Sequence, residues 1–152
     1  MLLSKRSLYG IRAALFMASQ PGSAYISVRE ISTRLGISQH YLPKVLQDLT
    51  RAGITRSHRG PSGGIALTRP PENITLREII VAVEGIPHPD QCPIAIAQCS
   101  AENPCTFCRR WKAARDRCGD LFDETTIADV NECLQLDALT FGETQTPMIS
   151  SS

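Results

Sequence analysis

The stretch from residue 27 to residue 68 constrains the fold more than any other part of the chain. Ser27-Val28-Arg29-Glu30 has the pattern of a capping box, in which the serine hydroxyl accepts from the third helical amide and the glutamate reaches back. Gly36 ends this short helix, and a second helix, which we expect Ser38 to cap, follows it. Two short helices joined by a turn at a glycine are typical of a helix-turn-helix unit.

A glycine-rich hairpin is predicted directly after the second helix. Residues 54–59 and 65–68 have the composition of short strands, and Gly60-Pro61-Ser62-Gly63-Gly64 forms the turn between them. This order of elements predicts a winged helix. The glycines do not match a phosphate-binding loop, because Ile65 stands where that motif requires Lys followed by Ser or Thr.

Further helices are predicted on both sides of this unit. Apolar spacing predicts one over residues 9–19, and a second capping box, Thr75-Leu76-Arg77-Glu78, opens another. A longer helix begins at Cys105, and its apolar seam has spacings of 4, 3, 4, 3 and 4 residues: Phe107, Trp111, Ala114, Cys118, Leu121 and Thr125. A single exposed helix with such a seam needs a partner, so we expect a homodimer.

The expected fold class is mainly α with a small β-hairpin wing: a winged helix-turn-helix domain followed by a long dimerisation helix. Four segments are expected along the chain. They are the winged domain over 1–85, a cysteine-rich loop over 86–108, the long helix with a short terminal helix over 106–130, and a polar, flexible tail over 131–152.

Charge is divided unevenly along the chain, although the net charge is only +1. Residues 1–70 contain ten Lys/Arg and two acids, and residues 71–152 contain six Lys/Arg and thirteen acids, which leaves +8 and −7. A basic first half favours a polyanionic partner, and double-stranded DNA is the polyanion that a winged helix suggests. The candidate DNA-binding residues lie on the second helix and the wing: Ser38, Gln39, His40, Tyr41, Lys44, Arg56 and Arg59.

Three of these side chains have chemically distinct expected roles. Gln39 suits an adenine edge, and Lys44 suits guanine or a phosphate. Arg59 is placed to enter the minor groove or hold a phosphate from the wing. Pro43 lies early in the second helix, and we expect it to bend that helix.

The sequence predicts neither a membrane span nor a secretion signal. The apolar run from Ala13 to Ala18 is far shorter than the roughly 20 residues that a spanning helix needs. Arg12 interrupts the one candidate signal segment, so its apolar part is too short. We therefore expect a cytoplasmic protein without a membrane partner.

All six cysteines lie beyond residue 91: Cys92, Cys99, Cys105, Cys108, Cys118 and Cys133. In a cytosolic chain this grouping indicates metal or redox chemistry rather than a disulfide scaffold. Three or four thiolates at these spacings suit zinc or an iron–sulfur cluster, and spacing alone does not separate the two. Cys105-x2-Cys108 also opens a helix as a dithiol redox motif does, but without the βαβ context of such enzymes.

Taken together, these features resemble the IscR/NsrR-type, or Rrf2, family of bacterial winged-helix regulators, over about residues 1–130. The resemblance implies a homodimeric DNA-binding transcription regulator that is not an enzyme. It rests on several short motifs: Leu3-Ser4-Lys5 with Tyr9, Ile37-Ser38 with Tyr41-Leu42, the wing from Arg59 to Gly64, the stretch from Ile79 to Gly85, and the spaced cysteines.

The same resemblance implies an iron–sulfur cluster, because the three cluster cysteines of several members map to Cys92, Cys99 and Cys105. The histidine ligand of IscR-like members maps to Cys108, which becomes the candidate fourth ligand. The N-terminal carboxylate of NsrR-like members maps to Leu8, which cannot bind iron. Two alternatives stay open: a cluster-free regulator that responds to thiol oxidation or a protein partner, and a small dithiol oxidoreductase.

Overall fold

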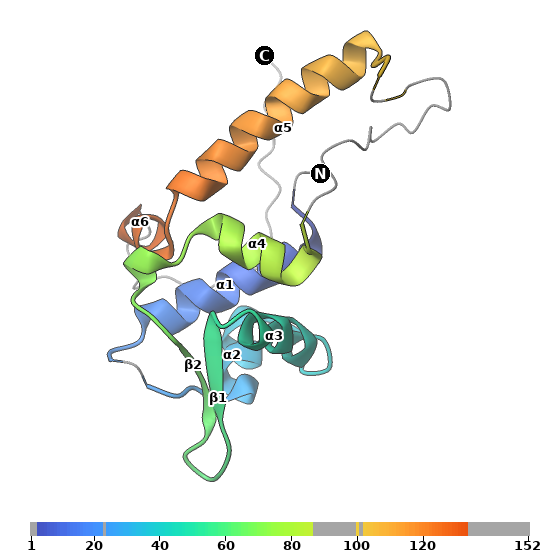
Figure 1. Ribbon diagram of the computed structural model, residues 1–152. Coiled ribbons are helices and arrows are strands. Elements are labelled where there is room, and N and C mark those ends of the chain that lie inside the picture. The colour runs from blue at the N-terminus through green and yellow to red at the C-terminus, as the bar shows by residue number, and fades with distance from the viewer. Residues whose placement is uncertain (1–2, 23, 87–99, 101, 134–152) are drawn as a thin grey trace, which may run out of the picture.

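The computed structural model describes residues 3–22, 24–86, 100 and 102–133 (Figure 1). These residues form a mainly helical body from which one long helix extends on one side and a two-stranded wing on another (Figure 1). The elements in order are α1 (Lys5–Ser19), α2 (Val28–Leu35), α3 (Leu42–Arg51), β1 (Thr55–His58), β2 (Gly64–Leu67), the 3₁₀ helix η1 (Pro71–Asn73), α4 (Leu76–Glu84), α5 (Thr106–Glu124) and α6 (Ile127–Cys133).

The first helix begins four residues earlier than the apolar pattern predicts. Ser4 is its N-cap and accepts a hydrogen bond from the N–H of Ser7 at 3.2 Å. Ser7 is fully buried, and its hydroxyl donates to the carboxylate of Glu84 at 3.0 Å. The start of α1 is therefore tied to the end of α4, which is where the chain enters the cysteine-rich segment.

The capping signals of the helix-turn-helix are confirmed in part at α2 and not at α3. Ser27 accepts from the N–H of Glu30 at 3.1 Å, and Gly36 ends α2 with a left-handed φ of 63°. The Glu30 side chain does not bond back to Ser27 in the described structure, so only the serine half of the predicted capping box forms. The second helix begins at Leu42, so the prediction that Ser38 caps it is wrong. Had the helix started after Ser38, Pro43 would lie beyond the first turn, where its missing N–H and its ring disrupt a helix.

Pro43 therefore defines where α3 starts instead of bending it. It lies in the first turn, where no intrahelical donor is needed and its fixed φ suits a helix. Ser38 still organises the turn, because its carbonyl accepts from the N–H groups of Tyr41 and Leu42 at 3.1 and 3.0 Å. The inward face of α3 consists of four buried residues: Leu42, Val45, Leu46 and Leu49.

The predicted wing is confirmed as an antiparallel hairpin. Its register pairs Thr55 with Leu67 at the base and His58 with Gly64 toward the tip. The chain before α2 adds a bridge in which Ile26 and Ile65 exchange backbone hydrogen bonds of 2.9 and 2.8 Å. A Cβ on Gly64 would stand 2.3 Å from the carbonyl oxygen of Ile26, so only glycine fits beneath this third segment.

We expect Gly64→Ala to destabilise the protein by at least about 2 kcal/mol, because a backbone contact must open to admit the methyl group. Urea unfolding followed by circular dichroism measures the change. Ser62→Ala, at an exposed position of the same turn, is the control and should stay within about 0.5 kcal/mol. Equal stability of the two variants would contradict the close approach of Ile26.

The hydrophobic core lies where α1, α3, α4 and α6 meet. Ala14, Ile31, Leu49, Ile79 and Ile127 are each fully buried, so every α-helix except α5 supplies side chains to it. Gly10 lets α1 approach α4, since a Cβ there would lie 3.1 Å from the side chain of Ile79. Leu76 and Ile80, also apolar residues of α4, are only half-buried.

The long helix is joined to the body at its C-terminal end. The N–H of Leu76 donates to Thr125 at 2.9 Å, and the N–H of Ile127 donates to Ile74 at 2.9 Å. The last helix is capped by its own residues, because the N–H of Thr126 donates to Asp129 at 2.7 Å and the Thr126 hydroxyl accepts from the N–H of Asp129 at 3.1 Å. That helix continues to Cys133, three residues into the segment predicted as tail, and the rest of that segment lies outside the described residues.

The capping box of α4 is confirmed in both directions and involves an ion pair. Glu78 accepts from the N–H of Thr75 at 2.8 Å and from the guanidinium of Arg69 at 2.7 Å. Burial opposes ionisation, but the hydrogen bonds from Thr75 and Arg69 and the charge of Arg69 outweigh it, so the pKa of Glu78 lies below its ordinary value of 4.5. The carboxylate therefore stabilises the fold above its unfolded pKa, and this contribution falls as pH drops through the folded pKa.

We expect Glu78→Gln to lower the melting temperature near neutral pH and to have little effect in acid well below pH 4.5. The loss near neutral pH should be about 0.5–1 kcal/mol, because the residue is partly exposed and solvent screens the pair. Thermal melts over a pH series measure it, with Glu72→Gln at an exposed site as the charge-matched control. A pH-independent difference between the wild type and Glu78→Gln would contradict this role.

Candidate nucleic-acid interface and cysteine pair

The turn before α3 presents polar side chains to solvent. Ser38, Gln39 and His40 are all exposed, and the N–H of His40 donates to the Ser38 hydroxyl at 3.2 Å. Tyr41 differs, because it is half-buried with its ring edge-on to Tyr9 at a centroid distance of 5.7 Å. The structure therefore places Ser38, Gln39 and His40 on an open turn. The side chain of Tyr41, in contrast, is partly packed against α1.

An ion-pair network fixes α3 against α1, and sequence analysis missed it. Asp48 accepts from Arg6 at 2.5 Å and from Arg51 at 3.1 Å. Arg6 and Asp48 are too far apart in sequence for any local pattern to join them. Lys44 is exposed on α3, and the described residues provide it with no ion pair. The network thus holds the helix while Lys44 remains available to a ligand.

The wing carries a cluster of Arg56, His58 and Tyr25 that sequence analysis also missed. The guanidinium of Arg56 lies 5.5 Å from the ring centre of Tyr25, and the ring of His58 lies 5.4 Å from that of Tyr25. Arg56 and His58 are two residues apart and lie on the same face of β1, while Tyr25 comes from the loop before α2. Arg59, next to the turn, is exposed.

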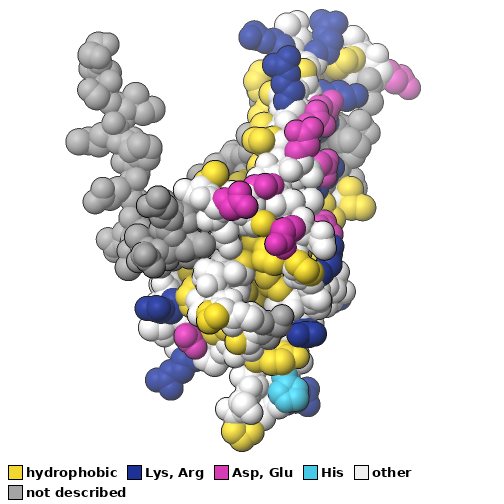
Figure 2. Space-filling view, turned by 90° about the vertical axis from the view of Figure 1, so that its left-hand side faces the viewer, with side chains coloured by type: hydrophobic (Ala, Val, Ile, Leu, Met, Phe, Trp, Pro, Cys, Tyr) yellow, Lys and Arg dark blue, Asp and Glu magenta, His cyan; other side chains and the backbone are white. Residues whose placement is uncertain are grey.

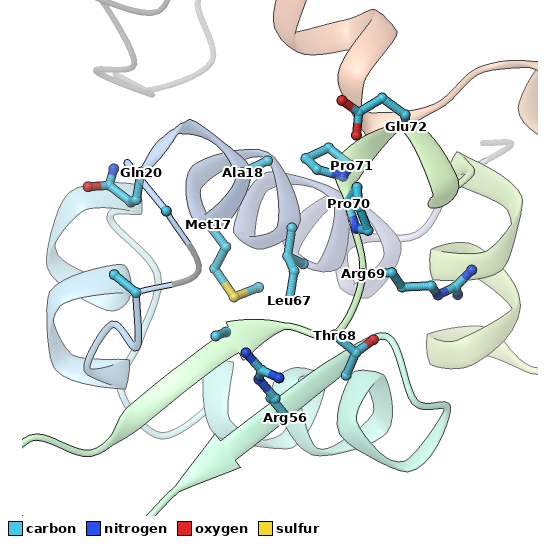
Figure 3. A pocket seen from close by; sticks show the side chains of 13 residues that line it. Met17, Ala18, Gln20, Arg56, Leu67, Thr68, Arg69, Pro70, Pro71 and Glu72 are labelled. Atoms are coloured by element: carbon cyan, nitrogen blue, oxygen red, sulfur yellow. The ribbon is translucent and has the colours of Figure 1, made fainter.

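A hollow of about 480 Å³ lies at the base of the wing, between the end of α1, the two strands and η1 (Figure 3). The side chain of Arg56 rises into this hollow beside Met17 and Leu67, whereas Arg69 points away from it (Figure 3). Arg56 and Arg59 are therefore not equivalent, because Arg56 lies at the wing's base and Arg59 beside its tip.

The candidate interface lies at the end of the molecule opposite the start of α5 (Figure 1). α3 packs against β1, so the recognition helix and the wing form one continuous edge. In the space-filling view Lys and Arg side chains lie around this end and also gather at the start of α5, while most Asp and Glu side chains lie between the two (Figure 2). A basic edge formed by a helix and a hairpin suits a duplex backbone.

The cysteine pair lies at the opposite end, where α5 begins. Cys105 is exposed as the N-cap of α5, and its sulfur accepts from the N–H of Cys108 at 3.4 Å. The positive end of the helix dipole favours a thiolate at this position. These two thiols are thus adjacent and have the chemistry of soft metal ligands.

The other two predicted metal ligands, Cys92 and Cys99, lie outside the described residues. Within the part of the chain that the structure describes, no group of three or more His, Cys, Asp or Glu side chains is arranged to hold a metal ion. Cys118 is half-buried on α5 and Cys133 ends α6. The donor pair at Cys105 and Cys108 fits a thiolate-bound metal centre, and the full ligand set stays a prediction.

A helix-turn-helix followed by an antiparallel wing, with a basic edge along both, defines the winged-helix class of DNA-binding transcription regulators. The chain belongs to the Rrf2 family, because the profile of that family, described as an iron-dependent transcriptional regulator, matches residues 3–132. Members of this family are DNA-binding regulators and not enzymes, which confirms the predicted class and excludes the dithiol oxidoreductase alternative. No helix in the described part of the chain is long and apolar enough to cross a membrane.

Solved structures of the same family support this assignment. CymR (YrzC), the global cysteine regulator of B. subtilis, is 27% identical with a TM-score of 0.71, over 87% of this chain and 97% of that one. T. potens IscR is 27% identical with a TM-score of 0.68, over 86% of each chain. The oxidized form of Staphylococcus aureus CymR is 29% identical with a TM-score of 0.69, over 87% of this chain and 97% of that one.

Proposed function

We propose that this protein is a cytoplasmic, homodimeric transcription regulator whose affinity for operator DNA depends on an iron–sulfur cluster. The observation that carries the proposal is the separation of two sites in one structure. An exposed basic edge on α3 and the wing lies at one end, and a thiol pair at a helix N-terminus lies at the other (Figure 1). A change at the thiols can then act on DNA binding through α5 and its junction with α4.

The DNA-binding end uses α3 as the recognition helix. Gln39 and Lys44 read bases or hold phosphates in the major groove, with Ser38 and His40 beside them. Arg59 reaches the backbone or minor groove from the wing, and Arg56 supports it from the base of the hairpin. In a two-fold dimer the two recognition helices enter successive major grooves, about 34 Å apart.

We expect DNA affinity to fall steeply with salt. Four phosphate contacts in each subunit make eight in the dimer, which corresponds to a log–log slope of roughly −7. Fluorescence anisotropy with a labelled duplex over a salt series measures it. A slope near zero would contradict an electrostatic interface and with it the assignment of this end of the molecule.

The proposed cluster is held by Cys92, Cys99, Cys105 and Cys108. When bound, it supplies a redox-sensitive and nitric-oxide-sensitive inorganic centre. The chain's own contribution is to present Cys105 at the start of α5 and to tie the other end of that helix to α4. Ordering or release of the cysteine segment then changes how α5 is held, and so the spacing of the two recognition helices.

Anaerobic purification followed by iron and sulfide analysis, visible absorption and DNA titration tests this function. We expect iron and acid-labile sulfide in the fresh protein, and a change of DNA affinity when the cluster is removed. Protein that contains neither iron nor sulfide but binds DNA would contradict the cluster and leave the DNA-binding assignment intact. Protein that ignores duplex DNA at low salt would contradict the function as a whole.

A second candidate is a cluster-free regulator that responds to thiol oxidation or to a protein partner. CymR of B. subtilis, a global cysteine regulator, and the oxidized form of Staphylococcus aureus CymR are each similar over most of both chains. The adjacent positions of Cys105 and Cys108 suit this alternative as well. Metal-free protein whose DNA affinity changes reversibly with peroxide and dithiothreitol would favour it over the cluster.

A further inference from the structure

Arg56 gives the hollow at the base of the wing a positive charge that no nearby acid neutralises. Its side chain points into the space between α1 and the two strands (Figure 3). Arg69 points away and is already paired, because it donates to Glu78 and to the carbonyl of Asn73, each at 2.7 Å. The described residues provide Arg56 with no ion pair. Its guanidinium is therefore open to an anion.

The ring of Tyr25 holds this guanidinium in position. The guanidinium carbon lies 5.5 Å from the ring centre, and the tyrosine comes from the loop before α2. A contact of this kind attracts the cation without neutralising its charge or occupying its N–H donors. An arginine fixed in this way loses less freedom when its two parallel donors meet a carboxylate. The hollow thus contains a preorganised anion-binding group.

The remaining walls of the hollow are largely apolar. Five apolar residues line it: Met17, Ala18, Leu67, Pro70 and Pro71. The Thr68 hydroxyl donates to the carbonyl of Gly53 at 2.6 Å, so its proton is not available to a ligand. The volume of about 480 Å³ lies within the range of about 300–1,000 Å³ that is usual for small-molecule pockets. The hollow therefore suits a ligand with an apolar body and one anionic end.

The charges around the hollow favour a single negative charge on the ligand. Glu72 is exposed at the rim, beyond Pro71 from Arg56 (Figure 3). One guanidinium compensates one carboxylate, and the Glu72 carboxylate repels any second negative charge. A carboxylate is therefore a better match than the dianion of a phosphate monoester.

We propose that this hollow binds a small carboxylate with a short apolar body. The carboxylate pairs with Arg56, and the body lies against Met17 and Leu67. A ligand bound there occupies the donors that Arg56 would otherwise offer to a DNA phosphate, so it weakens DNA binding. Only this second step rests on the proposed function, since binding of the carboxylate itself needs no DNA.

Titration with hexanoate, followed by NMR of the methionine methyl groups, tests the site without DNA. The Met17 signal, assigned from Met17→Leu, should shift until it saturates. Hexan-1-ol supplies the chain without the charge and acetate the charge without the chain, and each should bind at least about ten-fold more weakly. A Met17 signal that hexanoate does not move, or hexanol that binds as tightly as hexanoate, would overturn the proposal.

Two substitutions with opposite expected signs separate a binding site from a general change in structure. Arg56→Gln should raise the dissociation constant of hexanoate about ten-fold or more, because the charged donor pair is lost. Glu72→Gln should lower it about two- to three-fold, because a repelling charge at an exposed position is removed. Arg59→Gln, in the same hairpin but outside the hollow, is the control and should leave it unchanged. Equal affinity of the wild type and Arg56→Gln for hexanoate would overturn the site.

Competition with DNA is measured by fluorescence anisotropy of a labelled duplex. Saturating hexanoate should weaken DNA binding about three-fold or more relative to the same concentration of sodium chloride, which controls for ionic strength. Hexanoate that binds but leaves DNA affinity equal to this control would overturn the competition for Arg56. Protein that binds hexanoate but ignores duplex DNA at low salt would contradict the proposed function and still support the carboxylate site.

Discussion

Cys105→Ser should reduce the iron and sulfide content of anaerobically purified protein by about ten-fold or more. Cys105 occupies the N-cap of α5, where the N–H of Cys108 and the helix dipole stabilise its thiolate. A serine hydroxyl can still cap the helix but is a poor ligand for iron. The expected loss is therefore one of metal binding and not of folding, and circular dichroism should show an unchanged helix content.

Cys118→Ser is the matched control for this experiment. Cys118 is half-buried on α5, in the middle of the seam, and lies outside the proposed ligand set. It should retain iron and sulfide at wild-type levels. Equal metal content in the Cys105→Ser and Cys118→Ser proteins would contradict the cluster at the start of α5. Cys108→Ser then tests the fourth ligand, and iron loss close to that of Cys105→Ser would support it.

The double substitution Lys44→Ala with Arg59→Ala should weaken DNA binding at least about 100-fold. Each contact contributes about 1 kcal/mol or more, and a two-fold dimer loses four of them. Both side chains are exposed, on α3 and beside the wing turn, so their removal should leave the core intact. Anisotropy titrations at fixed salt measure the loss, and the salt slope should become shallower by about four because four phosphate contacts disappear.

Arg109→Ala with Lys112→Ala is the charge-matched control. It removes the same two kinds of cation from exposed positions on α5, at the end of the molecule away from the wing (Figure 1). DNA affinity should change by less than about three-fold. An equal loss in both double variants would mean that net charge, not the edge formed by α3 and the wing, determines binding.

Much of the fold could be predicted because its signals are local. Ser27 and Thr75 cap helices within three residues of their partners, and Gly36 ends α2 because it accepts a left-handed conformation. The hairpin follows from two short strands around a glycine-rich turn. The start of α3 was mispredicted at Ser38, since a good capping residue was given more weight than the constraint imposed by Pro43.

The candidate site was less predictable, because several of its contacts join residues far apart in the chain. The Arg6–Asp48 pair links α1 to α3, and Tyr25 from the loop before α2 contacts both Arg56 and His58. The seven candidate DNA-binding residues lie on or near α3 and the wing, and their role in binding DNA stays a prediction. The sequence could not show that Tyr41 packs against Tyr9, which removes much of that side chain from solvent.

By itself, the sequence determined the order of the elements, the family and the candidate thiol ligands. Each of these depends on residue type and spacing over a few positions, which folding does not change. Only the tertiary structure decided which side chains remain exposed and what surrounds them. It covers one side of α3, ties α5 to α4 at a single end and leaves Phe107 and Leu121 in solvent. Burial depends on packing between distant segments, and no local pattern contains that information.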